Sequence, residues 1–167
     1  KLMDVSKLKA PVMFLEIYKD SGLLIVVPPE GKPLVRTLDT GETSMYEQIK
    51  NELSLKDIVS AQKLMYSSTI DLSDMSQRII APLYKEISST VGMFEVETGL
   101  SISQMLITNL LPEQQWIVQK LSNDLGMQIP EFDLNELCAL LDVQIDDNVE
   151  WNMKDNRILP LLAAMGV

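Results

Sequence analysis

The N-terminal quarter of the chain has the hydrophobic pattern of β-strands. Residues 12–18 and 23–27 are rich in residue types that favour strands, and the Asp/Ser/Gly segment 19–22 between them is typical of a hairpin turn. A proline-rich turn then leads to residues 34–38, which can add a third strand at the edge of the sheet. We therefore expect a three-stranded antiparallel β-meander within residues 1–42.

After the meander, the apolar residues change to a helical period. Met45, Ile49 and Leu53 lie four residues apart, so they share one face of a helix. Ser54 is a suitable N-cap for a second helix, whose apolar face runs through residues 55–65. The sequence thus predicts two short helices directly after the strands.

A third helix is predicted through the apolar positions of residues 75–87. Asp71 or Ser73 can cap its start, and Pro82 indicates a kink or a break. The segment 92–99 is bounded by glycines, and we expect it to be a connection that holds either a short strand or the end of this helix.

Further apolar segments follow in the C-terminal part of the chain. A helix capped by serine is expected over residues 101–109, and Pro112 starts another helix that ends at Gly126. An aspartate-capped helix is expected over residues 133–141. The stretch 158–165 is apolar nearly all round, so it must be buried in the core or against a partner.

These patterns predict an α+β fold, in which a small N-terminal three-stranded antiparallel sheet packs against a bundle of short helices. The chain has 167 residues, of which 46% are hydrophobic, so it can bury one well-formed core. We expect the β-meander of residues 1–42 and the helical part of residues 43–167 to form one compact domain or two closely packed lobes.

Negative charge is concentrated in one part of the sequence. Residues 86–153 hold twelve acidic residues and a single basic one, Lys120, whereas residues 1–85 hold eleven of each. The net charge of −10 therefore arises from residues 86–153, the acidic segment. A surface of this sign repels nucleic acid and anionic membranes and attracts cationic surfaces.

The first functional hypothesis follows from this charge. We expect a non-enzymatic binding protein whose acidic segment covers a basic surface on a partner protein, in the manner of a nucleic-acid mimic, an immunity protein or a phage-encoded inhibitor. The partner would be a protein with a cationic surface, such as a nucleic-acid-binding protein, and nucleic acid itself would not be bound. The expected contact residues are Asp124, Glu131, Asp133, Glu136, Asp142, Asp146, Asp147, Glu150 and Trp151.

Little in the sequence points to catalysis. The chain has no histidine, and its single cysteine, Cys138, lies in an apolar helical pattern typical of a buried residue. The scattered glycines match no phosphate-binding motif, and the acidic cluster of residues 142–150 lacks the spacing of an EF-hand. Glu95 and Glu97 resemble two exposed residues more than a catalytic carboxylate pair. We therefore predict no enzymatic activity, no metal and no cofactor.

The compartment is also constrained by composition. No apolar run approaches the roughly 20 residues that cross a bilayer, and residues 1–9 lack the apolar core of a signal peptide. A lone cysteine allows no intramolecular disulfide, which fits a reducing compartment. We expect a cytoplasmic protein that does not bind membranes.

Two other classes of function remain open. The first is a structural subunit or assembly chaperone of a larger complex, held by apolar contacts of residues 158–167 and of the methionine-rich helices. A homo-oligomer that forms through the apolar C-terminus is compatible with this sequence. The second is an enzyme that uses carboxylates with a metal ion, in which case metal binding would raise the melting temperature.

Overall fold

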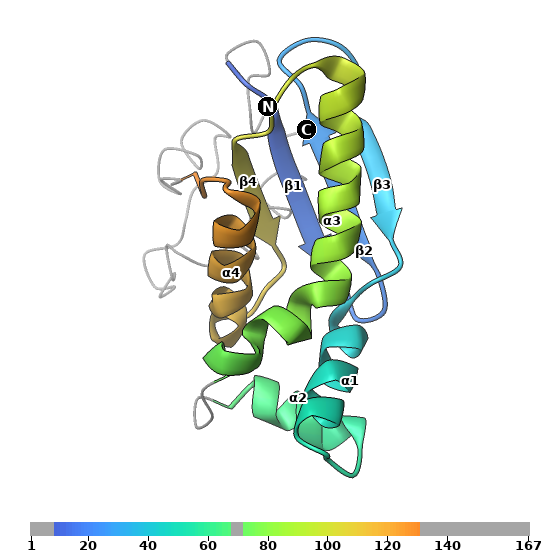
Figure 1. The fold of residues 1–167 in the computed structure, drawn as a ribbon, viewed down its shortest axis with the longest axis vertical. Helices are drawn as coiled ribbons and strands as arrows, with labels where there is room; N and C mark the ends of the chain where they lie inside the picture. Colours follow the sequence, from blue (N-terminus) through green and yellow to red (C-terminus); the bar gives the residue numbers. More distant parts are fainter. Residues whose placement is uncertain (1–8, 68–71, 131–167) are drawn as a thin grey trace, which may run out of the picture.

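Four strands form a single mixed β-sheet in the computed structural model, which describes residues 9–67 and 72–130 (Figure 1). The strands are β1 (Val12–Ile17), β2 (Gly22–Val27), β3 (Leu34–Leu38) and β4 (Gln104–Thr108). Their order is β3-β2-β1-β4, with β1 antiparallel to β2, β2 antiparallel to β3, and β4 parallel to β1. The expected N-terminal meander is thus present, but the sheet is mixed because β4 joins it.

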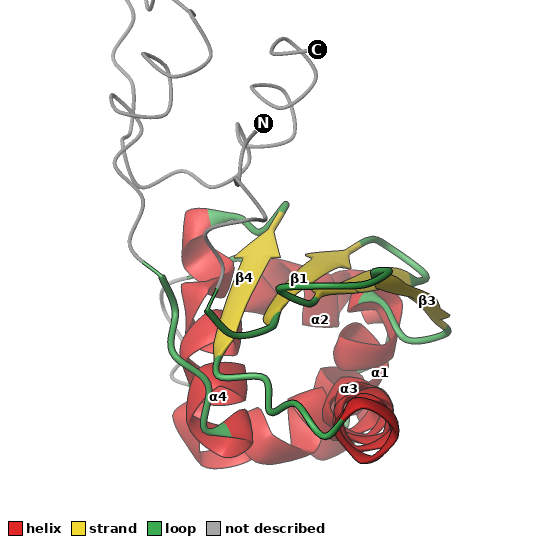
Figure 2. Ribbon diagram, turned by 90° about the horizontal axis from the view of Figure 1, so that it is seen from above, coloured by secondary structure: helices red, strands yellow, loops and turns green. Residues whose placement is uncertain are grey.

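The described helices all lie on the same side of the sheet (Figure 2). They are α1 (Glu42–Glu52), α2 (Ile58–Met65), α3 (Ser76–Thr98) and α4 (Gln115–Leu125). Short 3-10 turns at Ser73–Met75 and Pro112–Gln114 precede α3 and α4. The protein therefore has the α+β fold that the sequence predicts.

The main core lies between the sheet and these helices. β1 contributes Met13, Leu15 and Ile17, each at most 1% exposed, while the alternate residues Phe14 and Glu16 are only half-buried. Helix residues that are fully buried in the same core include Met45, Ile49, Ile79, Leu83, Ile87, Ile117 and Leu121. Because each such side chain contributes about 1.5–3 kcal/mol when it leaves water, this contact between layers stabilises the fold.

The helix expected over residues 101–109 is wrong, because the chain forms a strand there. β4 lies beside β1 and also makes a short parallel bridge from Gln104 to Gln128. All residues from Met105 to Thr108 are buried, so the strand shows no alternation of polar and apolar residues. A strand buried on both faces is a continuous apolar run, which periodicity alone does not distinguish from a buried helix.

Helix α3 continues through the segment expected to be a connection. Gly92 lies inside this helix, which ends at Gly99, where a φ of 69° places the backbone in the left-handed region. Pro82 also lies within α3, and the helix bends in its first turns (Figure 1). Ser73 does not cap the helix, since the N-cap position is Met75 and no side chain caps it.

The ends of two other helices test the expected caps. Asp57 caps α2, because its Oδ1 accepts a hydrogen bond from the Ser60 backbone N–H at 2.8 Å. The expected cap, Ser54, is wrong, since it lies three residues earlier in a left-handed conformation with a φ of 51°. Helix α4 ends at Gly126, as the sequence predicts, with a φ of 66°.

Several expectations fall on residues outside this description. The helices predicted over residues 133–141 and 158–165 lie there, as does Asp71, and the division of the chain at residue 42 stays a prediction. Within residues 9–67 and 72–130, no helix has the length and apolar character needed to cross a bilayer.

Candidate functional site at the carboxyl ends of β1 and β4

The carboxyl ends of β1 and β4 meet at one edge of the sheet because the two strands are parallel (Figure 1). The β1–β2 turn, residues 18–21, and the first turn of α1 lie at the same edge. We call this region the β1/β4 end. Open sheets with parallel strands usually bind their ligands outside such carboxyl ends, so this is the first place to look for a site.

The backbone of the β1–β2 turn is packed directly against the start of α1. The Glu42 N–H donates to the Tyr18 carbonyl at 2.9 Å, and the Thr43 N–H donates to the Lys19 carbonyl at 2.8 Å. These are the first two amides of the helix, which have no acceptor within it. A helix N-terminus binds an anion through such amides, but here the chain's own carbonyls accept from them.

Gly41 allows this close contact. A Cβ atom at this position would lie 2.4 Å from the Ser21 nitrogen and 2.6 Å from the Tyr18 carbonyl oxygen. Side chains reinforce the contact, since the Thr43 hydroxyl donates to Asp20 Oδ1 at 2.7 Å. The β1–β2 turn is therefore closed against α1.

A second set of contacts surrounds the Glu42 carboxylate. Its Oε2 accepts from the Tyr46 hydroxyl at 2.8 Å and from the Tyr66 hydroxyl at 3.4 Å, while its Oε1 accepts from Gln114 Nε2 at 2.7 Å. The two tyrosine hydroxyls are 2.8 Å apart. Gln114, which is fully buried, also accepts from the Leu111 N–H at 2.9 Å. This network joins α1, the end of α2 and the segment after β4.

Burial and hydrogen bonding fix the protonation of this network. Burial raises the pKa of Tyr46 far above its usual value of 10.0, and the hydrogen bonds with Tyr66 and Glu42 raise it further. Tyr46 therefore keeps its proton at any physiological pH and stays a donor. The network has no titration near neutral pH through which this tyrosine could act as a base.

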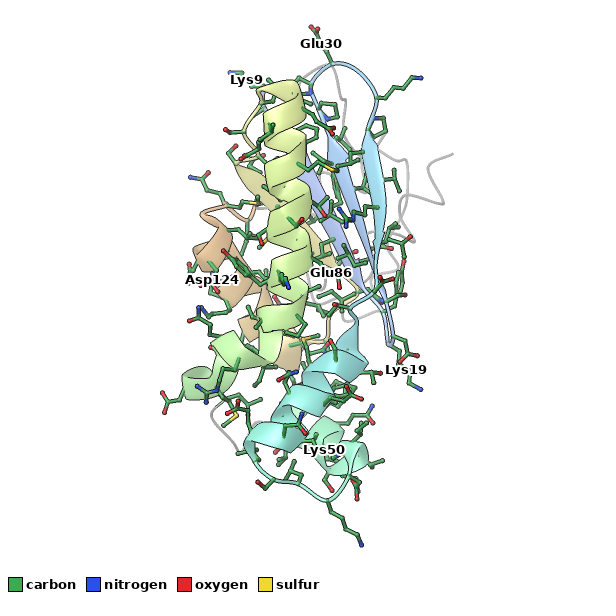
Figure 3. The ribbon with its side chains drawn as sticks, turned by 45° about the vertical axis from the view of Figure 1, so that its right-hand side comes forward. Lys9, Lys19, Glu30, Lys50, Glu86 and Asp124 are labelled. Carbon is green, nitrogen blue, oxygen red and sulfur yellow. The ribbon has the colours of Figure 1, made fainter. Side chains whose placement is uncertain are left out.

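A third carboxylate at the β1/β4 end also has donors within the chain. Glu16 accepts from the hydroxyls of Tyr18 and Thr108, the latter at 3.3 Å. The hydrogen bond to Glu16 and partial burial raise the pKa of Tyr18. Glu16, Asp20 and Glu42 give this end a negative potential, and Lys19 lies at the outer tip of the turn (Figure 3). Phosphate groups are repelled by such an arrangement.

Other described carboxylates also have structural partners. Glu86 on α3 accepts from the Thr40 hydroxyl and from the Asp39 N–H, the latter at 2.9 Å, and so joins α3 to the end of β3 (Figure 3). Glu95 accepts from the Ile102 N–H at 3.0 Å. Glu95 and Glu97 lie in a helix, so the extended pair does not form. Within the described residues, no three potential metal-ligating side chains of His, Cys, Asp or Glu gather.

One of the predicted partner-binding residues is in the described part. Asp124 lies on α4 and forms an ion pair with Lys120, one turn earlier, at 2.5 Å (Figure 3). The other eight predicted contact residues lie outside it: Glu131, Asp133, Glu136, Asp142, Asp146, Asp147, Glu150 and Trp151. Trp116, the other tryptophan, is half-buried against the core. The acidic binding face thus stays a prediction.

The Glu42 network was not predicted from the sequence. Glu42 and Gln114 are separated by 72 residues, and no motif connects them. The only local signal is the Gly41-Glu42 pair after a strand, because an acid is favourable in the first turn of a helix.

Comparisons with known proteins reveal the fold. No protein family and no curated protein matches the sequence. Among solved structures, a chain of the PilM–PilN type IV pilus biogenesis complex matches with a TM-score of 0.69 and 17% identity, over 94% of this chain and 45% of that one. An archaeal actin homolog matches with a TM-score of 0.56 and 9% identity, over 99% of this chain and 48% of its own.

The ethanolamine utilization protein EutJ from Carboxydothermus hydrogenoformans also matches, with a TM-score of 0.50 and 11% identity, over 72% of this chain and 44% of its own. The protein thus spans less than half the length of each of these structures. At these identities the likeness shows the fold alone. The chain has the fold of about half of an actin homolog.

Proposed function

We propose that this protein is a structural subunit that acts through protein–protein contacts in a larger assembly and hydrolyses no nucleotide itself. The observation that carries the proposal is the closed β1/β4 end. The amides of Glu42 and Thr43 donate to carbonyls of the β1–β2 turn, and carboxylates surround them. A phosphate group would have to displace these hydrogen bonds and approach a negative potential, and both cost free energy.

The comparisons support the same proposal from another side. One of the similar solved structures is a biogenesis complex, in which the matching chain assembles with another protein. For the present chain, the partner would accordingly be a protein. The acidic covering of a cationic surface is less well supported, since Asp124 is paired with Lys120 within its own helix.

Recovery of the assembly is the first test. The full chain, tagged and expressed in its source cells, should be recovered with a partner at constant stoichiometry. The complex should persist at about 1 M salt, where the Debye length falls to about 3 Å and contacts between exposed charges are screened. Release at moderate salt would instead support the acidic segment as the contact surface, and recovery of the chain alone would overturn the proposal.

A melting experiment tests the nucleotide part separately. Millimolar Mg-ATP or Mg-ADP should leave the melting temperature of the purified chain unchanged. A ligand present at about 100 times its Kd would stabilise the folded state by about 2.7 kcal/mol, which is readily measured. A rise in melting temperature with either nucleotide would therefore contradict the closed site.

A further inference from the structure

The outer face of α3 carries an exposed seam, which consists of Lys85, Ser89, Gly92 and Val96. These positions are spaced by four, three and four residues, so they form one line on the helix, opposite its buried face. Val96 is 87% exposed, and the neighbouring Met93 is 40% exposed. In Figure 2, α3 is seen end-on at the margin of the molecule, with this side away from the sheet.

Gly92 is not required by any contact within the protein. A Cβ atom there would meet nothing within 4 Å, and the backbone is helical. Glycine in the middle of a helix costs about 1 kcal/mol relative to alanine. A glycine on an exposed helix face allows another backbone to come close, which a larger side chain would prevent.

The charges around the seam determine which partner fits it. Lys85 lies at one end, Glu95 and Glu97 lie near the other, and residues 87–94 between them carry no charge. A second copy of α3 in antiparallel orientation would place Lys85 beside the partner's Glu97, and the reverse pair would form by symmetry. In parallel orientation, like charges would face one another at both ends.

We propose that two copies of this protein associate through antiparallel packing of their α3 helices across the seam. Val96 of each copy would cover Ser89 of the partner subunit, with Gly92 near the two-fold axis. Two helix faces bury less area than the roughly 1,200–2,000 Å² of a standard interface, so the dimer should be weak. This inference names one partner of the proposed structural subunit and so rests on that function.

Sedimentation velocity tests the association directly. The full chain should shift from monomer to dimer between roughly 1 and 300 µM, the range in which a weak interface is populated. Val96→Asp should weaken the dimer at least about tenfold, since it places a charge in the seam. Val59→Asp is the matched control, because Val59 on α2 is also exposed, at 57%, and lies outside the seam.

A charge swap tests the orientation. Lys85→Glu and Glu97→Lys should each weaken the dimer about three- to tenfold, whereas the double variant should recover the affinity of the original chain. Circular dichroism should show that all variants stay folded, since the substituted side chains are exposed. Losses that simply add in the double variant, or an equal loss in Val59→Asp, would overturn the antiparallel α3 interface.

The two proposals fail in distinguishable ways. A chain that stays monomeric throughout the concentration range but is recovered with another protein refutes the α3 interface and leaves the structural function intact. A chain that stays monomeric and is recovered alone refutes both.

Discussion

At the residue scale, Gly41 determines how closely the β1–β2 turn approaches α1. Its neighbours across the contact are backbone atoms of Tyr18 and Ser21, which lie within 2.6 Å of the site that a Cβ atom would occupy. Backbone atoms do not move aside as the end of a flexible side chain does. Any larger residue must therefore separate the turn from the helix and break the hydrogen bonds between them.

Gly41→Ala should lower the free energy of unfolding by about 2–4 kcal/mol, because the added methyl group overpacks the contact and breaks buried hydrogen bonds. Urea denaturation measures this loss. Gly92→Ala is the matched control, since the same methyl group meets no atom there, and it should raise the free energy of unfolding by about 1 kcal/mol. Equal effects at the two positions would contradict the close approach.

Asp57 predicts a local pH dependence. The Ser60 N–H that donates to its side chain lowers the pKa of Asp57 below 3.8, its ordinary value. A carboxyl whose pKa is lowered on folding stabilises the fold above its unfolded pKa, and this contribution disappears as the pH falls through the folded value. Asp57→Ala should thus destabilise the protein at about pH 7, and the difference from the original chain should shrink at about pH 3. A difference independent of pH would show that Asp57 does not act as a charged cap.

At the element scale, the strands differ in how they are held. β1 pairs with β2 on one side and β4 on the other, whereas β3 pairs only with β2 among the described strands. Val35 in β3 is 59% exposed, but β1 residues that face the helices are fully buried. Local opening is easiest where few contacts must break, so β3 should open before the centre of the sheet.

Hydrogen exchange measured by mass spectrometry should reveal this order. Peptides that cover β3 should exchange at least about tenfold faster than those that cover β1, which corresponds to a difference in opening free energy of at least about 1.4 kcal/mol. Peptides from β2, which is also paired on both sides, serve as the control. If β3 proved as protected as β1, an unseen strand or partner would have to cover its edge.

The elements also show which parts of the fold are readable from sequence. The β1–β2 hairpin was predicted because strand-forming residues flank a short turn. β4 was missed because Ile102, Met105 and Leu106 match helical spacing, and burial on both faces removes the alternation of a strand. The extent of α3 was missed because Gly92 is usually read as a break, although burial of residues such as Ile87 outweighs its cost of about 1 kcal/mol.

The candidate site was harder to predict than the fold. Its contacts join Tyr18, Glu42 and Gln114, which come together only after the sheet and helices have formed. None of these residue types is unusual where it occurs. The charge pattern was easier to see, but the only described residue of the predicted acidic face, Asp124, has a basic partner within its own helix.

At the scale of the whole molecule, net charge should affect stability more than function. The charge of −10 makes the folded chain repel itself, and the excess lies in the acidic segment. Replacing Asp142, Asp146 and Asp147 by asparagine should raise the melting temperature at about 0.01 M salt, where the Debye length is about 30 Å. At about 1 M salt this gain should vanish, because the remaining charges are screened. Recovery of the protein partner should not change, since the proposed contacts do not depend on these carboxylates.

A second variant separates local repulsion from net charge. Replacing Glu30, Glu47 and Asp74 removes as many negative charges from exposed positions in the first 85 residues, where acids and bases are balanced. Each of these acids has cations in the same part of the chain, so its removal should raise the melting temperature less. Equal gains would mean that only net charge matters. Loss of the partner in the first variant but not the second would instead return the acidic segment to the role of a binding surface, because only a specific contact depends on where the charges lie.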